Sequence, residues 1–272
     1  MFNIVLFLLN LINLSAFINI APCSLLPSGL LSQNYPGNDD LTTDSTLDEI
    51  LERYKSEIIE KRGTAEVVDR LENLVGRFPG IEVDINLYKL LYPFPLDEFQ
   101  ENGIKSLIQG NNVIVSTPTG SGKTLVGELA IYFALMLGLR VAYTTPLKAL
   151  SNQKFADFKN RYGGDRVALL TGDIAINRGA PITVMTTEVF RNMIYDSDSQ
   201  NQLSNLFAVI FDEFHYMNDP DRGTVWEESV ISCPKHVRIL ALSGAYIYSF
   251  DMLLSLIQHN IHLQPRWETS AI

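Results

Sequence analysis

Cysteine is scarce in this sequence of 272 residues, which has only Cys23 and Cys233. Two thiols so far apart cannot build a disulfide-rich scaffold or a cysteine-ligated zinc site, and they favour a reducing compartment. Basic residues are also few, with 21 Lys and Arg against 31 Asp and Glu, and none precedes Arg53. The formal charge of −10 excludes nucleic-acid binding through overall positive charge, so any such binding must come from a local site.

The rest of the composition favours a folded protein. Hydrophobic residues make up 46% of the sequence and aromatic residues 10%, which supports a packed core and excludes a disordered or fibrous chain. The length fits one large domain or two modest ones. No internal repeat occurs.

The first 22 residues are strongly apolar. No charged residue occurs between Phe2 and Pro22, and Ile4–Leu9 is an unbroken apolar run. We interpret residues 1–22 as a hydrophobic leader: a cleaved targeting sequence, an incorrectly assigned start of the reading frame, or a membrane anchor. Four asparagines interrupt this segment, and it lacks the basic residues of signal and transit peptides. We therefore expect no stable membrane association.

A linker and a helical segment are expected next. Residues 23–46 are rich in Pro, Ser, Gly, Asn, Asp and Thr, a composition typical of a linker. Apolar residues then recur at helical spacing from Leu47, with acidic residues in the first turn and Gly63 as the stop. A second amphipathic helix is expected over 64–75. We interpret 47–90 as a helical N-terminal segment that packs beside the main domain.

From residue 91 short apolar runs alternate with helical stretches. Buried strands alternating with helices indicate an α/β fold, in which a mostly parallel sheet is covered by helices on both faces. The sequence predicts strands at 113–115, 141–143, 167–170, 182–185, 208–211 and 239–242, and helices around 97–109, 123–137 and 148–160. Ligands of such sheets bind beyond the carboxyl ends of the strands. The polar motifs of this sequence fall at those ends.

A glycine-rich segment follows the first of these strands and opens the next helix. It reads Ser116-Thr117-Pro118-Thr119-Gly120-Ser121-Gly122-Lys123-Thr124, and its last three residues are the end of the P-loop pattern. The backbone N–H groups of 119–122 and the helix N-terminus can hold phosphate oxygens. Lys123 can reach the β- and γ-phosphates, and Thr124 can bind Mg²⁺. We predict a nucleoside triphosphate site, although Thr117 replaces the first glycine of the pattern.

An acidic pair follows the strand at 208–211. Asp212 can hold Mg²⁺ at the strand end, directly or through water, and Glu213 can orient and deprotonate the attacking water. His215 would couple this site to the rest of the domain. A polar turn after a core strand is the simpler interpretation, but the P-loop elsewhere in the sequence argues against it.

Asp212-Glu213-Phe214-His215 has the form of a DExH box, and the sequence resembles superfamily 2 RNA helicases of the superkiller-type group, most closely their cyanobacterial and plastid members. Further motifs in the family's order lie at 94–100, 144–154, 170–173, 185–188, 216–219 and 222–228. The resemblance covers about residues 90–244. It implies a RecA-like P-loop domain over 91–245 that uses ATP and Mg²⁺, with Gln100 as the contact to the adenine base.

The resemblance also implies contacts to a nucleic-acid strand. The residues concerned are Thr145, Pro146, Lys148, Thr171, Gly172 and Thr186. Backbone N–H groups and hydroxyls can hold phosphates or sugars without a basic patch, and Lys148 adds a charge-assisted contact. Singly these are ordinary loop residues, but as a set in the family's order they predict binding of single-stranded RNA with little sequence preference.

The likeness ends near residue 245. The family has Ser-Ala-Thr where this sequence has Ser243-Gly244-Ala245, and 246–272 have no likeness to it. The remaining residues are too few for the second RecA-like domain, which carries the arginine finger in the family. We interpret 246–272 as a non-family tail that arose from a retained intron, a frameshift or a truncated gene model, and we expect a longer intact product.

Two hypotheses of function follow from these motifs. The first is an ATP-dependent RNA helicase in a truncated form that carries only the ATP-binding domain. The second is an ATP- and RNA-binding fragment without unwinding activity, which the abrupt end of the likeness favours. We expect the protein in a plastid, with the cytoplasm or the nucleus as alternatives.

Overall fold

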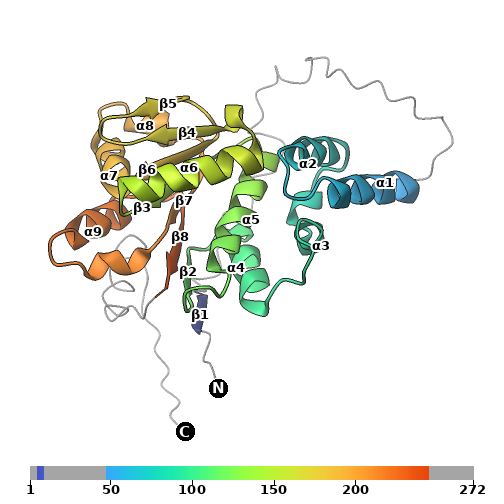
Figure 1. The fold of residues 1–272 in the computed structure, drawn as a ribbon, viewed down its shortest axis with the longest axis horizontal. Helices are drawn as coiled ribbons and strands as arrows, with labels where there is room; N and C mark the ends of the chain where they lie inside the picture. Colours follow the sequence, from blue (N-terminus) through green and yellow to red (C-terminus); the bar gives the residue numbers. More distant parts are fainter. Residues whose placement is uncertain (1–4, 9–46, 245–272) are drawn as a thin grey trace, which may run out of the picture.

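The computed structural model describes residues 5–8 and 47–244. The interpretations of most of the leader, of the linker at 23–46 and of the tail at 246–272 fall outside these residues. The described part has a single sheet with helices on both faces, and the N-terminal helices lie at one side (Figure 1). None of its helices is long and apolar enough to cross a membrane.

The N-terminal segment contains the two expected helices. They are α1 (Leu47–Glu60) and α2 (Glu66–Arg77), followed by the short helices η1 (Ile81–Val83) and α3 (Ile85–Lys89). Gly63 ends the first helix region with a positive φ of 74°, a conformation that glycine adopts without strain. Apolar side chains of α2, such as Leu71 and Leu74, are fully buried in the same core as helix α5. The segment therefore extends the core of the main domain.

The sheet contains the six predicted strands and two more. In chain order they are β1 (Val5–Leu8), β2 (Val113–Ser116), β3 (Arg140–Thr145), β4 (Val167–Leu170), β5 (Ala175–Ile176), β6 (Ile182–Thr186), β7 (Leu206–Phe211) and β8 (Arg238–Ser243). Their spatial order is β1-β2-β8-β7-β3-β6-β4-β5. The six central strands are parallel, and β1 and β5 pair antiparallel at the two edges. The mostly parallel sheet predicted from the sequence is confirmed.

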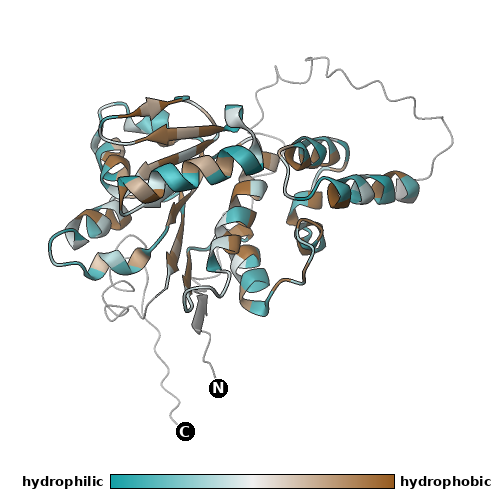
Figure 2. Ribbon diagram, in the orientation of Figure 1, coloured by the Kyte–Doolittle hydropathy of each residue, from teal (hydrophilic) through white to brown (hydrophobic). Residues whose placement is uncertain are grey.

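Helices cover both faces because strand side chains alternate between two apolar cores. One core lies under α4 (Glu98–Ile108), α5 (Lys123–Met136) and α6 (Lys148–Tyr162), which the short η2 (Gly164–Arg166) follows. The other lies under α7 (Thr187–Tyr195), α8 (Ser199–Leu203), η3 (Phe214–Asn218) and α9 (Gly223–Ile231). On β3, Tyr143 belongs to the first core and Ala142 to the second. Figure 2 shows apolar residues concentrated on the strands, with hydrophilic residues along α1 and α6.

Helix α9 packs tightly on the turn that follows β7. A Cβ atom added at Gly223 would lie 2.4 Å from the carbonyl oxygen of Met217, so no other residue fits this position without a shift. Trp226 is buried against Phe211 and Phe214, with ring centroids 5.7 and 5.6 Å away. The segment 222–228, which the family resemblance singled out, thus packs against the DExH turn and holds it in place.

We expect Gly223→Ala to destabilise the chain by about 1–3 kcal/mol, because the added methyl group meets backbone that cannot move freely. Urea unfolding followed by circular dichroism measures this loss. Gly76→Ala is the matched control, since Gly76 lies in α2 with open space where a Cβ would lie and should be neutral or stabilising. Equal stability of the two variants would contradict the close packing at Gly223.

Candidate nucleotide and nucleic-acid site

The predicted site residues lie along one edge of the sheet. The parallel strands end on the same side, so the motifs that follow them are brought together. The P-loop and the DExH box follow β2 and β7, which flank β8. The predicted strand-binding residues follow β3, β6 and β4, which are neighbours in the other half. The edge therefore divides into two halves, which we call the nucleotide half and the nucleic-acid half after the roles predicted for their residues.

The P-loop joins β2 to α5 through two glycines with positive φ. Gly120 has φ 86° and open space where a Cβ would lie, and Gly122 has φ 83° and precedes the first residue of α5. The Thr117 hydroxyl lies 2.5 Å from the Ser121 hydroxyl, and the two share a hydrogen bond. Thr117, which replaces the first glycine of the pattern, therefore closes the loop on itself. The loop leads directly into the N-terminus of α5, an arrangement that suits phosphate binding.

The end of β8 lies between the P-loop and the DExH box. A Cβ atom added at Gly244 would lie 3.1 Å from Nζ of Lys123, 3.0 Å from Oγ1 of Thr119 and 3.8 Å from Oε2 of Glu213. Lys123 is only 6% exposed. The alanine that the family has at this point would crowd Lys123 and Thr119, so glycine at 244 leaves room beside the lysine.

Gln100 is buried and bridges α4 to the P-loop. Its Oε1 accepts a hydrogen bond from the backbone N–H of Asp97 at 2.9 Å, and its Nε2 donates to the carbonyl oxygen of Gly122 at 3.1 Å. The first bond is half of a capping box at the start of α4. Gln100 thus holds the P-loop glycine in place. Its contact to an adenine base stays a prediction.

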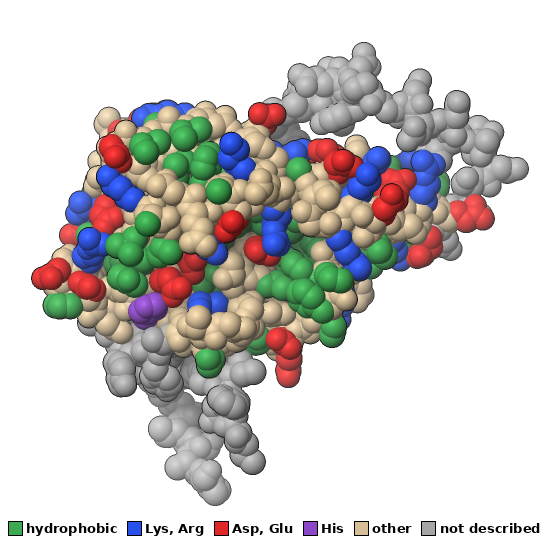
Figure 3. Space-filling model, in the orientation of Figure 1, with side chains coloured by type: hydrophobic (Ala, Val, Ile, Leu, Met, Phe, Trp, Pro, Cys, Tyr) green, Lys and Arg blue, Asp and Glu red, His purple; other side chains and the backbone are tan. Residues whose placement is uncertain are grey.

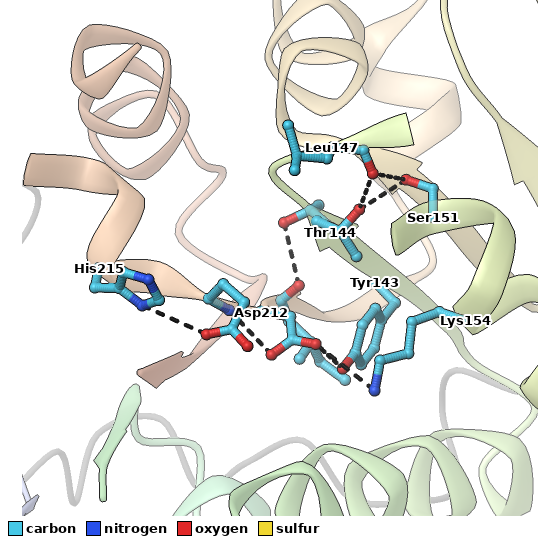
Figure 4. Close-up of polar contacts among 10 residues, drawn as sticks. Tyr143, Thr144, Leu147, Ser151, Lys154, Asp212 and His215 are labelled. Carbon is cyan, nitrogen blue, oxygen red and sulfur yellow. Dashed lines mark hydrogen bonds and ion pairs between the residues drawn. The ribbon is translucent and has the colours of Figure 1, made fainter. Parts of the chain in front are cut away.

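Asp212 is a buried carboxylate at the end of β7, with 6% of its surface exposed. The Tyr143 hydroxyl donates to its Oδ2 at 2.7 Å, and Nζ of Lys154 lies 3.7 Å from the same oxygen (Figure 4). The backbone N–H of Glu213 donates to Oδ1 at 3.0 Å. Burial and the nearby Asp212 carboxylate raise the pKa of Tyr143 well above its ordinary value, so its hydroxyl stays a donor.

Glu213 has the left-handed conformation, with φ 51°, which is uncommon for a residue other than glycine. Its Oε2 lies 3.4 Å from Nδ1 of His215, which starts the turn η3 together with Phe214. Such backbone strain is typical of functional sites. The turn places the Glu213 carboxylate at the sheet edge, on the side of the P-loop and Gly244. Glu213 as the base and His215 as a coupling residue stay predictions.

In the nucleic-acid half, the turn between β3 and α6 is stabilised internally. The Thr145 hydroxyl donates to the carbonyl oxygen of Leu147 at 3.1 Å and lies 2.7 Å from the Ser151 hydroxyl. The Pro146 carbonyl oxygen accepts a hydrogen bond from Arg222 at 3.3 Å. Because the Thr145 side chain is 1% exposed, its hydroxyl shapes the turn, and its contact to a strand stays a prediction.

Lys148 and Thr171 meet through an acidic residue between them. Nζ of Lys148 and the Thr171 hydroxyl donate to the same Asp173 oxygen at 2.8 and 3.0 Å. The Lys148 hydrogen bond, followed by the Thr171 one, lowers the pKa of Asp173. Gly172 between them is exposed, whereas Thr186 is buried at the start of α7. The structure thus brings Lys148 and Gly172 together at the surface, with the buried Thr171 beside them.

The oxygen atoms that this edge offers as metal ligands fit ATP and Mg²⁺. A buried carboxylate and the Thr124 hydroxyl at the start of α5 are ligands that Mg²⁺ takes together with phosphate oxygens. Within residues 49–244 no cluster of three His, Cys, Asp or Glu side chains could hold a metal alone. Nucleotide phosphates would supply further ligands to a Mg²⁺ ion held by these two residues. The nucleotide would supply the group that is transferred and part of the metal's coordination.

Sequence reasoning assigned no role to several residues of this site. Tyr143 lies in the middle of a predicted strand, where aromatic residues are common, and its contact to Asp212 crosses 69 positions. Lys154 is the last residue of the family motif at 144–154, six positions after Lys148. Its spacing in the sequence does not link it to any acidic residue. A tyrosine hydroxyl in a buried strand needs a hydrogen-bond partner, and this was the one signal that could have pointed to Tyr143; Lys154 gave no such signal.

Charge is mixed on the face shown in Figure 3, where Lys and Arg side chains alternate with Asp and Glu. A parallel sheet with a P-loop and an acidic turn at one edge makes this part of the chain a RecA-like ATP-binding domain. Residues 97–252, more than half of the chain, match the family model for DEAD/DEAH box helicases. The chain belongs to the DEAD/DEAH box helicase family.

Curated relatives are similar over the same region. The chloroplastic DExH-box ATP-dependent RNA helicase DExH15 of Arabidopsis thaliana is 49% identical over 182 residues, which are 65% of this chain and 16% of that protein. The probable helicase HelY of Mycobacterium tuberculosis is 52% identical over 152 residues, or 56% and 17% of the two chains. The antiviral helicase SKI2 of Saccharomyces cerevisiae is 46% identical over 160 residues, or 59% and 12%. This chain thus spans less than a fifth of these relatives' length.

A solved structure has the same fold. The helicase MrfA, crystallised with DNA and AMPPNP, superposes with a TM-score of 0.54 at 17% identity. The match covers 65% of this chain and 28% of that one. At this identity the likeness establishes the shared RecA-like architecture alone.

Proposed function

We propose that this chain is the first RecA-like domain of an ATP-dependent RNA helicase of the superkiller-type group. Lys123 and Thr124 bind the phosphates and Mg²⁺ of ATP, Asp212 holds the same ion, and Glu213 activates water. The loops after β3, β4 and β6 bind a single RNA strand. Full hydrolysis and unwinding require a second RecA-like domain that closes on this edge.

The observation that carries this proposal is the division of one sheet edge into two halves. The phosphate motifs follow β2 and β7, and the hydroxyl-rich loops follow the adjacent β3, β6 and β4. Strand β3 connects the two halves. Its Tyr143 contacts Asp212 in the nucleotide half, and its Thr145 shapes the turn that carries Lys148 in the other half. Such an arrangement suits an ATP-driven motor on a nucleic-acid strand.

RNA is favoured over DNA by the names of the relatives. The Arabidopsis protein that is 49% identical is called an RNA helicase, whereas MrfA, crystallised with DNA, is 17% identical. The word chloroplastic in the first name supports a plastid location, which we include in the proposal. The cytoplasm and the nucleus remain the alternatives.

Fluorescence anisotropy with labelled single strands tests the proposal. The chain should bind oligouridine and mixed-sequence RNA with similar affinity, and more tightly than DNA of the same sequence. Adding AMPPNP and Mg²⁺ should change RNA affinity if the two halves belong to one machine. Tighter binding to DNA would make the protein a DNA helicase, and no binding to either at low salt would overturn the proposal.

Lys148→Ala should weaken RNA binding and lower its salt dependence. Removing one phosphate contact from a single-stranded complex reduces the slope of log K against log salt by about 0.7. Lys148 is exposed and pairs with the exposed Asp173, so its loss leaves the core intact. Lys159→Ala, a change of another exposed lysine in α6, is the control. An unchanged slope in the Lys148 variant would remove this residue from the strand site.

A further inference from the structure

The Asp212 carboxylate has two side-chain neighbours at the same oxygen. Tyr143 donates to Oδ2 at 2.7 Å from the adjacent strand β3, and Lys154 lies 3.7 Å from Oδ2 on helix α6 (Figure 4). Nζ of Lys154 also lies 5.5 Å from the centre of the Tyr143 ring. The three side chains form one cluster at the place where the proposed function puts Mg²⁺.

Tyr143 is held rigidly. Its side chain is fully buried, and its ring packs edge-on against Phe158 with 4.9 Å between centroids. The main chain holds Tyr143 and Asp212 at a fixed separation, because the backbone N–H of Asp212 donates to the carbonyl oxygen of Thr144, the next residue after Tyr143, at 2.9 Å. A neutral donor in a fixed place restricts rotation of the carboxylate. Such groups behind a metal ligand raise metal affinity because they keep the ligand oriented.

Lys154 acts on the same carboxylate by charge. A buried carboxylate is costly without a positive partner, and Lys154 lies close enough to Asp212 to be one. A divalent cation at Asp212 would be repelled by the lysine's positive charge. The Lys154 side chain is 22% exposed, so it has room to move when a cation binds. The triphosphate brings negative charge that offsets this repulsion.

We propose that Tyr143 and Lys154 are positioning residues with opposite effects on the metal site. Tyr143 orients Asp212 for the divalent cation, and Lys154 neutralises Asp212 when no nucleotide is bound, which makes binding of the cation depend on the nucleotide. This inference rests on the proposed function, because it assumes that Asp212 is the metal ligand.

Electron paramagnetic resonance of Mn²⁺, added to the 272-residue chain with or without AMPPNP, measures both effects. Wild type should bind Mn²⁺ much more tightly with AMPPNP than without it. Tyr143→Phe keeps the ring and should weaken Mn²⁺ binding in the AMPPNP complex by about 10–100-fold. Lys154→Met should strengthen Mn²⁺ binding to the nucleotide-free chain by about tenfold or more.

Matched controls separate this role from a structural one. Tyr132→Phe changes another buried tyrosine, on α5, and Lys159→Met changes another lysine of α6. Both should bind Mn²⁺ as wild type does. Binding of metal-free AMPPNP should be the same in Tyr143→Phe and wild type, which a general loss of structure would not give. Thermal melting of each variant verifies that it is folded.

The outcomes distinguish the inference from the proposed function. If wild type binds no Mn²⁺ with AMPPNP, both are overturned. If wild type binds Mn²⁺ but Tyr143→Phe matches Tyr132→Phe, or Lys154→Met does not strengthen nucleotide-free binding, this inference alone is overturned. Should Tyr143→Phe fail to fold, the partly exposed Lys154 carries the test by itself.

Discussion

Replacing Lys123 with alanine is expected to weaken ATP binding by about 10- to 150-fold, the factor that corresponds to a lost charge-assisted hydrogen bond of about 1.5–3 kcal/mol. Lys123 is the first residue of α5 and is 6% exposed, with its ammonium beside Thr119 and Gly244. In the proposed complex it contacts the β- and γ-phosphates. In a protein that carries both RecA-like domains, RNA-stimulated ATP hydrolysis should be lost as well.

Titration with a fluorescent ATP analogue measures this loss. Lys105→Ala is the matched control, because Lys105 lies on the exposed side of α4 and pairs with Glu101 at 3.3 Å. It should bind the analogue as wild type does. Equal affinity of the Lys123 and Lys105 variants would remove the P-loop role, and persistent RNA-stimulated hydrolysis in the Lys123 variant would refute the assignment as an ATP-driven helicase.

Trp226→Ala should destabilise the domain by about 3–5 kcal/mol, as expected for truncation of a large buried aromatic side chain. Trp226 is 2% exposed and packs against Phe211 of β7 and Phe214 of the DExH turn. Its loss leaves a cavity directly under the segment that carries Asp212 and Glu213. We therefore expect weaker nucleotide-dependent metal binding in the fraction that remains folded.

Urea unfolding of both tryptophan and control variants measures the stability loss. Ile231→Ala is the control, since Ile231 ends the same helix with 40% of its surface exposed. Ile231→Ala should lower the free energy of unfolding much less than Trp226→Ala does, because an exposed side chain loses little buried area when it is shortened. A loss of similar size for both variants would show that α9 depends on its ends and not on the aromatic cluster.

The sequence predicted the six central strands because each is a short, buried apolar run that ends at a polar motif. The strand β5 was not predicted, because two exposed residues form no pattern. The strand β1 lies within the apolar run that we interpreted as a leader, and its pairing with β2 depends on residues more than 100 positions away. Periodicity within a window cannot report such long-range pairing.

Motif order likewise predicted which residues would gather at the sheet edge, but not how each would be used. Gln100 satisfies a capping box and the P-loop carbonyl, and the Thr145 hydroxyl satisfies its own turn. These bonds depend on close approach between segments far apart in the chain. Tyr143 and Lys154 were overlooked for the same reason, since their common partner Asp212 lies on another strand.

Helix α6 is fastened to β3 at two points. Ser151 lies 2.7 Å from Thr145 through the hydroxyls, and Lys154 lies over the Tyr143 ring. The helix begins at Lys148, and Lys154 lies six positions later, about 9 Å along the axis. Under the proposed function, one rigid helix therefore carries both a lysine of the RNA site and the lysine beside the metal ligand, so that a shift of α6 along β3 would change both sites together.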